Sequence, residues 1–164
     1  MTKMSYTRIA SPVGTLLLAG DDSGLRHIMF ASETQSPDPA WREDAAPLTE
    51  TIRQLQAYFA GEREDFDLPL APEGTPFQME VWQRLRDIPY GQTISYGELA
   101  RRIGNPKASR AVGLANGSNP IPIVIPCHRV IGSNGKLTGY GGGLPIKEKL
   151  LALERHQLRL LPLG

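Results

Sequence analysis

Cys127 is the one cysteine among the 164 residues of the chain, and His128 follows it directly. A thiolate is a strong nucleophile, and histidine is the side chain whose unperturbed pKa lies nearest neutral pH. The pair could therefore form a covalent bond to carbon once the thiol proton is removed. Adjacent side chains point apart in extended chain, however, and a thiol in apolar surroundings is usually inert. These two residues alone leave two interpretations open, a nucleophile or a buried, unreactive thiol.

Glu154 could orient His128. The last predicted helix starts near Pro145. We expect this helix to bury Ile146, Leu150, Leu151 and Leu153. At about 100° per residue, Glu154 falls between Leu150 and Leu151 on the apolar face of that helix. A buried carboxylate needs a partner, and an acid that orients a catalytic base is a common arrangement. The alternative is a carboxylate at the flank of the helix that reaches water.

The small number of cysteines and histidines limits the chemistry. A single cysteine excludes an intramolecular disulfide and a cysteine-rich zinc site. The three histidines, His27, His128 and His156, have no metal-ligand spacing to one another. The cysteines and histidines of the sequence therefore indicate no metal site.

The stretch around Cys127, residues 119–131, is strongly apolar and should be buried. Pro120, Pro122 and Pro126 fix the backbone angle φ and lack an amide hydrogen, which argues against a regular central strand. We expect a rigid, irregular segment that presents Cys127 in a set position.

Helix start signals precede this segment. Residues 75–78, Thr-Pro-Phe-Gln, and residues 95–98, Ser-Tyr-Gly-Glu, both have the form of a capping box. The helix that starts at residues 95–98 should end at Gly104, and Asn105 with Pro106 can start the next one. Two short helices joined by a tight turn predict a helix-turn-helix, although such a pattern serves structure more often than DNA binding.

The second of these helices, residues 106–116, carries Arg110 among small side chains. The small residues are Ala108, Ser109, Ala111, Gly113 and Ala115. A helix of this composition could enter a narrow groove with one protruding arginine. Close packing against another helix would explain the same composition.

The net charge of +1 conceals an asymmetry along the chain. Residues 1–75 carry 6 Lys and Arg against 12 Asp and Glu, a net charge of −6, and residues 76–164 carry 12 against 5, a net charge of +7. No acidic residue lies between Glu98 and Glu148. The basic residues of that stretch are Arg101, Arg102, Lys107, Arg110, Arg129, Lys136 and Lys147. Such a field suits a polyanion, and a solvated basic face is the alternative.

The first 74 residues are predicted to form a small α+β domain. In chain order the predicted elements are strands at 13–19 and 25–30, joined by the turn at 21–24 into a hairpin, a loop at 32–47, a helix at 48–59 and a short strand at 66–70. Residues 69–74 look like a linker. No run of about 18 apolar residues and no signal peptide is visible, so we expect a cytoplasmic protein that does not enter a membrane.

Residues 126–130, Pro-Cys-His-Arg-Val, closely resemble the signature of the methylated-DNA–protein-cysteine methyltransferases, also called alkylguanine-DNA alkyltransferases. Further matches, in the same order, are Pro89-Tyr90-Gly91, Ser95-Tyr96-Gly97, Gly104-Asn105-Pro106, Arg110-Ala111-Val112-Gly113, Gly117-Ser118-Asn119-Pro120 and Gly139-Tyr140-Gly141-Gly142-Gly143. The resemblance is strong over residues 75–154. It implies an α/β (α+β) fold, with a small ribonuclease-H-like domain at 1–74. A mainly helical domain at 75–164 would then hold the helix-turn-helix and the alkyl acceptor.

The resemblance also implies a reaction, DNA repair by direct damage reversal. A methyl or other alkyl group would move from O6 of guanine, or O4 of thymine, to Cys127, and the protein would stay alkylated after one turnover. The partner would be double-stranded DNA, bound through the minor groove with the alkylated guanine flipped out as substrate. No cofactor or metal is implied, and the protein is expected to be a monomer.

The resemblance assigns the catalytic roles to five residues. Cys127 would be the acceptor, His128 its base acting through a water, and Glu154 the group that orients His128. Asn119 would be a hinge that holds the reactive segment by hydrogen bonds. Tyr96 would crowd the phosphate of the flipped nucleotide and offer its hydroxyl to guanine N3.

The remaining residues carried over from the family bind DNA or the base. Arg110 would fill the stack where the nucleotide has left. The further DNA-contacting positions are Tyr96, Gly97, Asn105 and Ser133. The guanine pocket would consist of Tyr140 and the backbone of Val130 and Gly141. Two positions depart from the family pattern and bear on which alkyl groups fit: many relatives have Ala or Ser at Gly141, and the pocket-facing Asn116 is often apolar.

Other classes of protein share parts of this pattern. A damage sensor of the alkyltransferase-like kind lacks the cysteine. A related helix-turn-helix regulator carries an extra cysteine-bearing domain, for which this chain is too short. A cysteine hydrolase would turn over repeatedly and would need an oxyanion hole near Cys127.

Overall fold

The computed structural model describes residues 3–31, 36–132, 134–135, 140 and 143–160, with side chains up to residue 155. The chain divides into two compact units, Met1–Glu73 with Pro120–Pro122 and Gly74–Asn119 with Ile123–Gly164. The boundary between residues 74 and 75 stays a prediction. In the described part of the chain, no helix is both long and apolar enough to cross a membrane.

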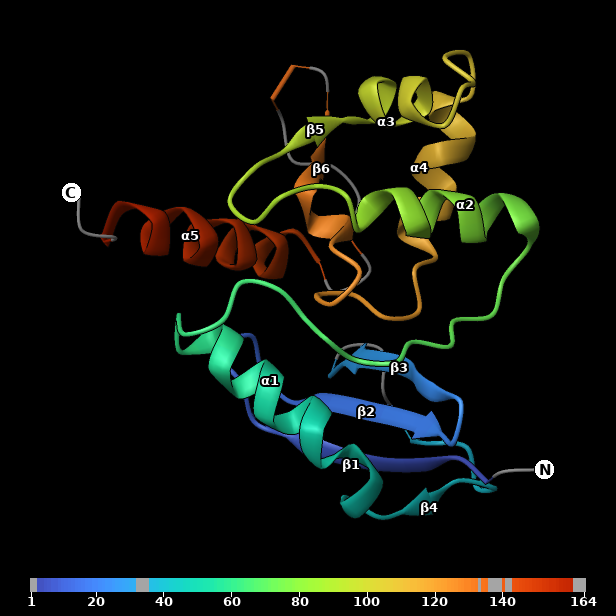
Figure 1. The fold of residues 1–164 in the computed structure, drawn as a ribbon, viewed down its shortest axis with the longest axis vertical. Helices are drawn as coiled ribbons and strands as arrows, with labels where there is room; N and C mark the ends of the chain where they lie inside the picture. Colours follow the sequence, from blue (N-terminus) through green and yellow to red (C-terminus); the bar gives the residue numbers. More distant parts are fainter. Residues whose placement is uncertain (1–2, 32–35, 133, 136–139, 141–142, 161–164) are drawn as a thin grey trace. The chain divides into compact units, whose positions relative to one another are not determined.

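The first unit is built on a four-stranded sheet with the order β3-β2-β1-β4 (Figure 1). The strands are β1 (Ser5–Ile9), β2 (Leu16–Asp21), β3 (Gly24–Phe30) and β4 (Arg42–Glu43). The pairs β1–β2 and β2–β3 are antiparallel, and β1–β4 is parallel. The predicted hairpin is therefore confirmed as β2–β3, with a turn in which the Ser23 amide donates to Asp21 Oδ1 at 2.8 Å.

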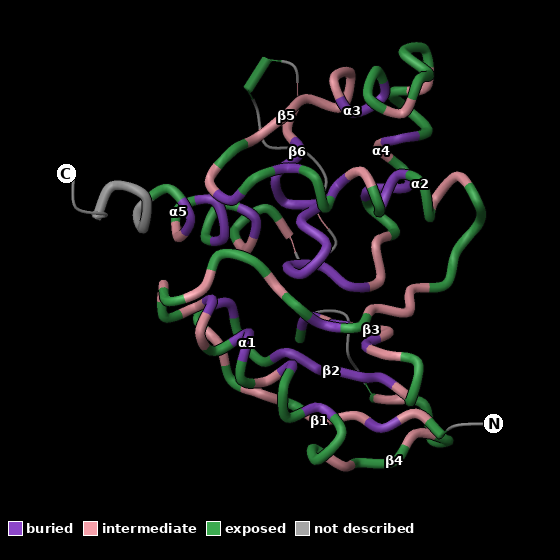
Figure 2. Tube along the Cα trace, in the orientation of Figure 1, coloured by how far each residue is buried: buried purple, intermediate pink, exposed green. Residues whose placement is uncertain are grey.

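The core of this unit forms along β2 and one helix. β2 is buried from Leu16 to Gly20 (Figure 2), and the predicted helix is confirmed as α1 (Thr49–Phe59), after a short 3-10 turn η1 (Ala46–Leu48). α1 buries Leu55 and Tyr58. The unit also closes on Pro120, whose carbonyl accepts from the Ile28 amide at 3.0 Å.

Two predictions for the first unit are wrong. Residues 66–70 do not form a strand, because Pro69 has no amide hydrogen to donate and the pairing is limited to one bridge between Leu25 and Leu70. The predicted loop at 32–47 contains the strand β4, and β1 was not predicted at all. Residues 32–35 lie outside the described residues.

The second unit is mainly helical. Its elements are α2 (Pro76–Leu85), β5 (Ile94–Ser95), α3 (Tyr96–Arg102), α4 (Ser109–Gly117), the 3-10 turn η2 (Cys127–Arg129), β6 (Val130–Ile131) and α5 (Leu144–Leu160). α4 packs against both α2 and α3, and β5 pairs with β6 in parallel. This pairing joins the chain that follows Cys127 to the residues that immediately precede α3.

The helix starts were predicted with mixed success. The capping box at Thr75 is confirmed, because its hydroxyl accepts from the Gln78 amide and the Gln78 side chain accepts from the Thr75 amide. At Ser95 only the first half forms, since the Glu98 carboxylate accepts instead from Arg101 and Arg102.

The predicted start of the second short helix is wrong. α4 begins at Ser109 rather than at Pro106, and no side chain caps it. The Ala108 amide donates to the Asn105 carbonyl at 3.0 Å, which closes residues 105–108 into a turn ahead of the helix. Asn105 therefore belongs to this turn and does not cap α4.

Gly24 gives a test of the hairpin. Its φ is +137°, and a Cβ there would lie 2.4 Å from the Pro69 carbonyl oxygen, which is held by the Leu25 amide. We predict that Gly24→Ala lowers the free energy of unfolding by about 2 kcal/mol or more. Urea denaturation followed by far-ultraviolet circular dichroism measures this change.

Gly117→Ala is the matched control. Gly117 is helical and has no atom within 4 Å of a built Cβ, so alanine should raise stability by up to about 1 kcal/mol. Equal stability of the two variants would contradict this account of Gly24.

Candidate active site

Glu154 on α5 is the centre of a buried cluster of charges. Its side chain is 0 % exposed, and its Oε2 lies 2.7 Å from Nε2 of His128. Arg129 donates to both carboxylate oxygens, from Nε at 2.9 Å and from Nη2 at 3.0 Å, and the Gly91 amide donates to Oε1 at 3.1 Å. Arg129 Nη1 also donates to the Ile88 carbonyl at 2.7 Å. The buried carboxylate therefore has hydrogen-bond donors at both oxygens and a positive charge beside it.

The charges of this cluster fix which nitrogen of His128 is free. Burial alone would raise the pKa of Glu154, but the hydrogen bonds that His128 and Arg129 donate and the charge of Arg129 hold it below its ordinary value. Burial lowers the pKa of His128, so this side chain is neutral near pH 7. A neutral imidazole facing an ionised carboxylate at 2.7 Å must carry its proton on Nε2. Nδ1 is then the basic nitrogen, and none of the described residues makes a hydrogen bond to it.

Cys127 begins the 3-10 turn η2 directly after Pro126, and it is 4 % exposed. Burial raises the pKa of its thiol to about 11, although hydrogen bonds with Asn119 and Tyr140 and the charge of Lys147 act in the opposite direction. The thiol is therefore protonated at neutral pH, and ionising it requires a base.

Lys147 is a further member of the site, and our sequence analysis missed it. The side chain is buried on α5, its Nζ donates to the Val130 carbonyl at 2.6 Å, and burial lowers its pKa. Its charge acts on Cys127 and favours the thiolate. Helix geometry could have found it, because Lys147 precedes Glu154 by seven residues and so lies on the same face of α5.

The exposed basic field is smaller than the sequence predicted. Arg129 and Lys147 are buried, and Arg101 and Arg102 both pair with Glu98. A count of charges along the chain cannot separate buried and paired cations from free ones. Arg110, by contrast, is exposed on α4, and no carboxylate pairs with it in the described part of the chain.

Two asparagines connect α4 to the reactive segment. Asn119, just after α4, donates from Nδ2 to the Ile125 carbonyl at 2.8 Å, and Asn116 on α4 donates to the Cys127 carbonyl at 3.4 Å. Ile123 lies between Asn119 and Ile125 in the chain, and it is buried with a φ of +75°, a strained conformation for a β-branched residue. The asparagine contacts hold this irregular segment in one shape.

The other predicted site residues lie on the elements next to this segment. Tyr96 starts α3, and its ring is 3.7 Å from the position of a Cβ built on Gly113 of α4. Gly97 is half-buried, Asn105 is exposed, and Val130 and Tyr140 are buried and half-buried respectively. Ser133 and Gly141 lie outside the described residues.

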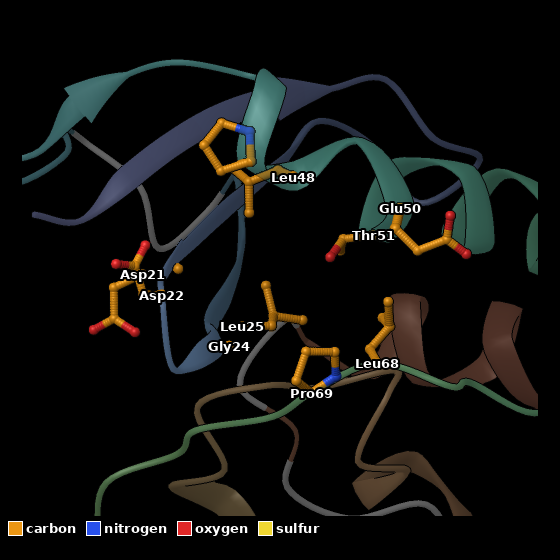
Figure 3. A pocket seen from close by; sticks show the side chains of 11 residues that line it. Asp21, Asp22, Gly24, Leu25, Leu48, Glu50, Thr51, Leu68 and Pro69 are labelled. Carbon is orange, nitrogen blue, oxygen red and sulfur yellow. The ribbon is translucent and has the colours of Figure 1, made fainter. Parts of the chain in front are cut away.

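A separate pocket lies within the first unit. It has a volume of about 300 Å³ between the β2–β3 turn and the start of α1, and Asp21, Asp22 and Glu50 line it beside Leu25 and Leu48 (Figure 3). None of the predicted site residues lines it. Among the described residues, no group of three His, Cys, Asp or Glu side chains could hold a metal ion.

Comparisons with known proteins bear on both units. Residues 76–156 match the family described as "6-O-methylguanine DNA methyltransferase, DNA binding domain", and residues 4–72 match its "ribonuclease-like domain". A relative from Methanosarcina acetivorans, named methylated-DNA–protein-cysteine methyltransferase, is 58 % identical over 92 % of this chain and 98 % of its own. One of the same name from Mycolicibacterium paratuberculosis is 54 % identical over 93 % of each chain.

Solved structures show the same similarity. The crystal structure of Mycobacterium tuberculosis OGT in complex with DNA has a TM-score of 0.88 and 52 % identity, over 93 % of this chain and 94 % of that one. The structure of Mycobacterium tuberculosis O6-methylguanine methyltransferase has a TM-score of 0.87 and 49 % identity, over 97 % and 99 %. The predicted fold class, a small sheet domain followed by a helical domain, is confirmed.

The Arg129–Glu154 ion pair predicts a specific effect on stability. Arg129→Met leaves the Glu154 carboxylate buried without its main counter-charge, so the free energy of unfolding at pH 7 should fall by about 3–5 kcal/mol. Urea denaturation measures the loss. Arg101→Met, which breaks an exposed pair with Glu98, should change stability little.

The pH dependence of the loss tests its origin. Because the folded-state pKa of Glu154 is depressed, its stabilising contribution is present above its ordinary value of 4.5 and is lost as pH falls through the folded-state pKa. In Arg129→Met, burial acts on Glu154 without the opposing charge of this arginine, so the carboxylate binds a proton at a higher pH than in the unmodified protein. The difference in the free energy of unfolding between the two proteins should therefore narrow as pH falls from 7 through 4.5. A difference that stays constant down to pH 3 would show that lost packing, not charge, is its source.

Proposed function

The chain belongs to the methylated-DNA–protein-cysteine methyltransferase family, and we propose that Cys127 is the residue that accepts the alkyl group. The protein is a DNA-repair enzyme that transfers an alkyl group from DNA to a cysteine of its own chain. The assignment of Cys127 rests on the residue that lies beside it. The only cysteine of the sequence lies next to a buried histidine whose partners leave one nitrogen basic.

The first step is removal of the thiol proton. With Nε2 of His128 bonded to Glu154, the basic Nδ1 takes the Cys127 proton, through a bridging water. Glu154 then stabilises the imidazolium cation, as it orients the neutral ring beforehand. The ammonium group of Lys147 favours the thiolate that remains.

The second step is displacement at the alkyl carbon. The Cys127 thiolate forms a bond to this carbon, the carbon–O6 bond breaks, and its electron pair stays on guanine. The Tyr96 hydroxyl donates a proton to N3, so guanine leaves as a neutral base, and the proton held by His128 restores Tyr96 through solvent. The product on the protein is a thioether, for which the described site has no leaving group or second nucleophile, so each molecule reacts once.

DNA is the partner, and we propose that α4 binds it through the minor groove. O6 of guanine lies inside the duplex, so its alkyl group can be reached only when the nucleotide is flipped out. Apart from Leu114, the side chains around Arg110 on the exposed face of α4 are small, which allows the helix backbone to come close to the groove. Arg110 would occupy the space of the flipped base, with Gly97, Asn105 and Ser133 on the flanking backbone.

We propose that the guanine pocket forms beside β6. Tyr140 would line it, and the backbone of Val130 and Gly141 would read the edge of the base. The Val130 carbonyl accepts from Lys147, and its second lone pair can accept from the guanine amino group. O4 of thymine, a similar exocyclic oxygen, is a second substrate. Each proposed group comes from one chain, which is consistent with a monomer.

Stoichiometry tests the proposed acceptor. Because a thioether is a dead end, repaired lesions in methylguanine-containing DNA should never outnumber protein molecules, and peptide mass spectrometry should find one added methyl group on Cys127. Cys127→Ser should still bind this DNA and transfer nothing, since an alcohol ionises far less readily than a thiol. Sustained turnover by an unmodified protein would instead indicate a hydrolase.

Glu154→Gln tests the proposed base. The amide keeps the shape of the side chain but not its charge, so His128 becomes a weaker base. The single-turnover transfer rate at pH 7 should then fall by about 10²-fold or more, and DNA affinity should stay nearly constant. A pH–rate profile of both proteins, measured where both are folded, checks this. The same rate with the same pH dependence in both proteins would exclude Glu154 from the mechanism.

A further inference from the structure

Leu114 on α4 is the most exposed large apolar side chain among the described residues. It is 73 % exposed, compared with 43 % for Leu144 and 40 % for Met79. A single exposed leucine is ordinary on a protein surface, and its position is what gives this one meaning. Leu114 follows Arg110 by four residues, so the two side chains lie about 40° apart on the same face of α4.

The remainder of this face is made of small residues. Ser109, Ala111 and Gly117 are the other exposed positions of α4, whereas Val112, Ala115 and Asn116 form its buried face. Leu114 is therefore the one large apolar group beside Arg110. It projects from the surface that the proposed function places in the minor groove.

We propose that Leu114 reads the floor of the minor groove and gives the protein a preference for an A·T pair near the lesion. The inference rests on the proposed docking of α4 and adds a determinant of sequence context to it. With the axis of α4 lying along the groove, the rise of about 6 Å over four helical residues spans about two base pairs at a spacing of 3.4 Å. In this orientation Leu114 lies about two base pairs from the point where Arg110 enters the stack.

The preference follows from what each base pair presents in the minor groove. A·T pairs expose only the acceptors N3 and O2, whereas G·C pairs add the protruding N2 amino donor. Leucine has no acceptor, so against G·C it would shield this amino group from water without bonding it, and it would also lose contact with the floor. Against A·T the groove has room for the side chain, which then gains apolar contact with the sugar walls.

The test is a set of methylguanine duplexes that differ by one base pair. Each of the three positions on either side of the lesion is changed in turn from A·T to G·C, and the single-turnover rate at limiting protein is measured. We expect one position, about two pairs from the site of Arg110, at which G·C slows transfer about fivefold. At that position 2,6-diaminopurine·T, which adds the N2 amino group to an A·T pair, should be as slow as G·C. Inosine·C, which lacks the amino group, should be as fast as A·T.

Leu114→Ala should remove this preference and weaken duplex binding about fivefold. Leucine carries no charge, so the dependence of binding on salt should not change, whereas Arg110→Ala should reduce the salt slope by about one. Transfer from free methylguanine base should be unaffected by Leu114→Ala. Met79→Ala, which removes an exposed apolar side chain from α2, is the control and should alter none of these quantities.

The outcomes separate this inference from the function it rests on. Suppose that Arg110→Ala impairs duplex repair, and that the sequence preference either is absent or persists in Leu114→Ala. The proposed role of Leu114 is then overturned, whereas the docking of α4 stands. If neither variant alters duplex binding, the docking of α4 itself is wrong. Slow transfer with inosine·C, alongside fast transfer with A·T, would also overturn the inference. The preference would then derive from the stiffness of the duplex and not from the amino group.

Discussion

The buried ion pair between Arg129 and Glu154 is the interaction on which the rest of the site depends. It neutralises a carboxylate in the interior of the second unit, and this carboxylate in turn fixes the tautomer of His128. The same two side chains hold the backbone at Ile88 and Gly91. Without the arginine, the carboxylate would bind a proton or contact water, and the position of the proton on His128 would no longer be fixed. A structural charge pair thus determines which nitrogen carries the proton in the neighbouring histidine, which we propose as the catalytic base.

A site residue could be placed from the sequence only where the geometry of its own helix determines its position. Helical phase placed Glu154 on the apolar face of α5, where the structure has it, and the same reasoning would have placed Lys147 beside it. Lys147 and Arg129 were instead predicted to belong to an exposed basic stretch, because the sequence does not show whether a charged side chain is buried. Their burial is explained only by partners distant in sequence, the Val130 carbonyl and Glu154.

The fold shows the same division between local and distant causes. The β2–β3 hairpin and α1 have strong local signals, a turn and a helical repeat, and both were predicted. β1 has an irregular burial pattern, and the two-residue β4 exists only through parallel pairing with it. The start of α4 is a different kind of error. Asn105-Pro106 has the local chemistry of a helix start, but the chain uses it to close a turn.

The burial of Cys127 also determines how long the thiol stays intact before the protein meets a lesion. A reagent consumed in its first reaction must remain intact until it meets its lesion. With a thiol pKa of about 11, only roughly one molecule in 10⁴ carries a thiolate at pH 7, and peroxides and disulfides react with thiolates. At 4 % exposure, the sulfur is also shielded from oxidants and stray electrophiles in solution. Burial therefore slows the oxidation and unspecific alkylation of the thiol, either of which would inactivate the acceptor.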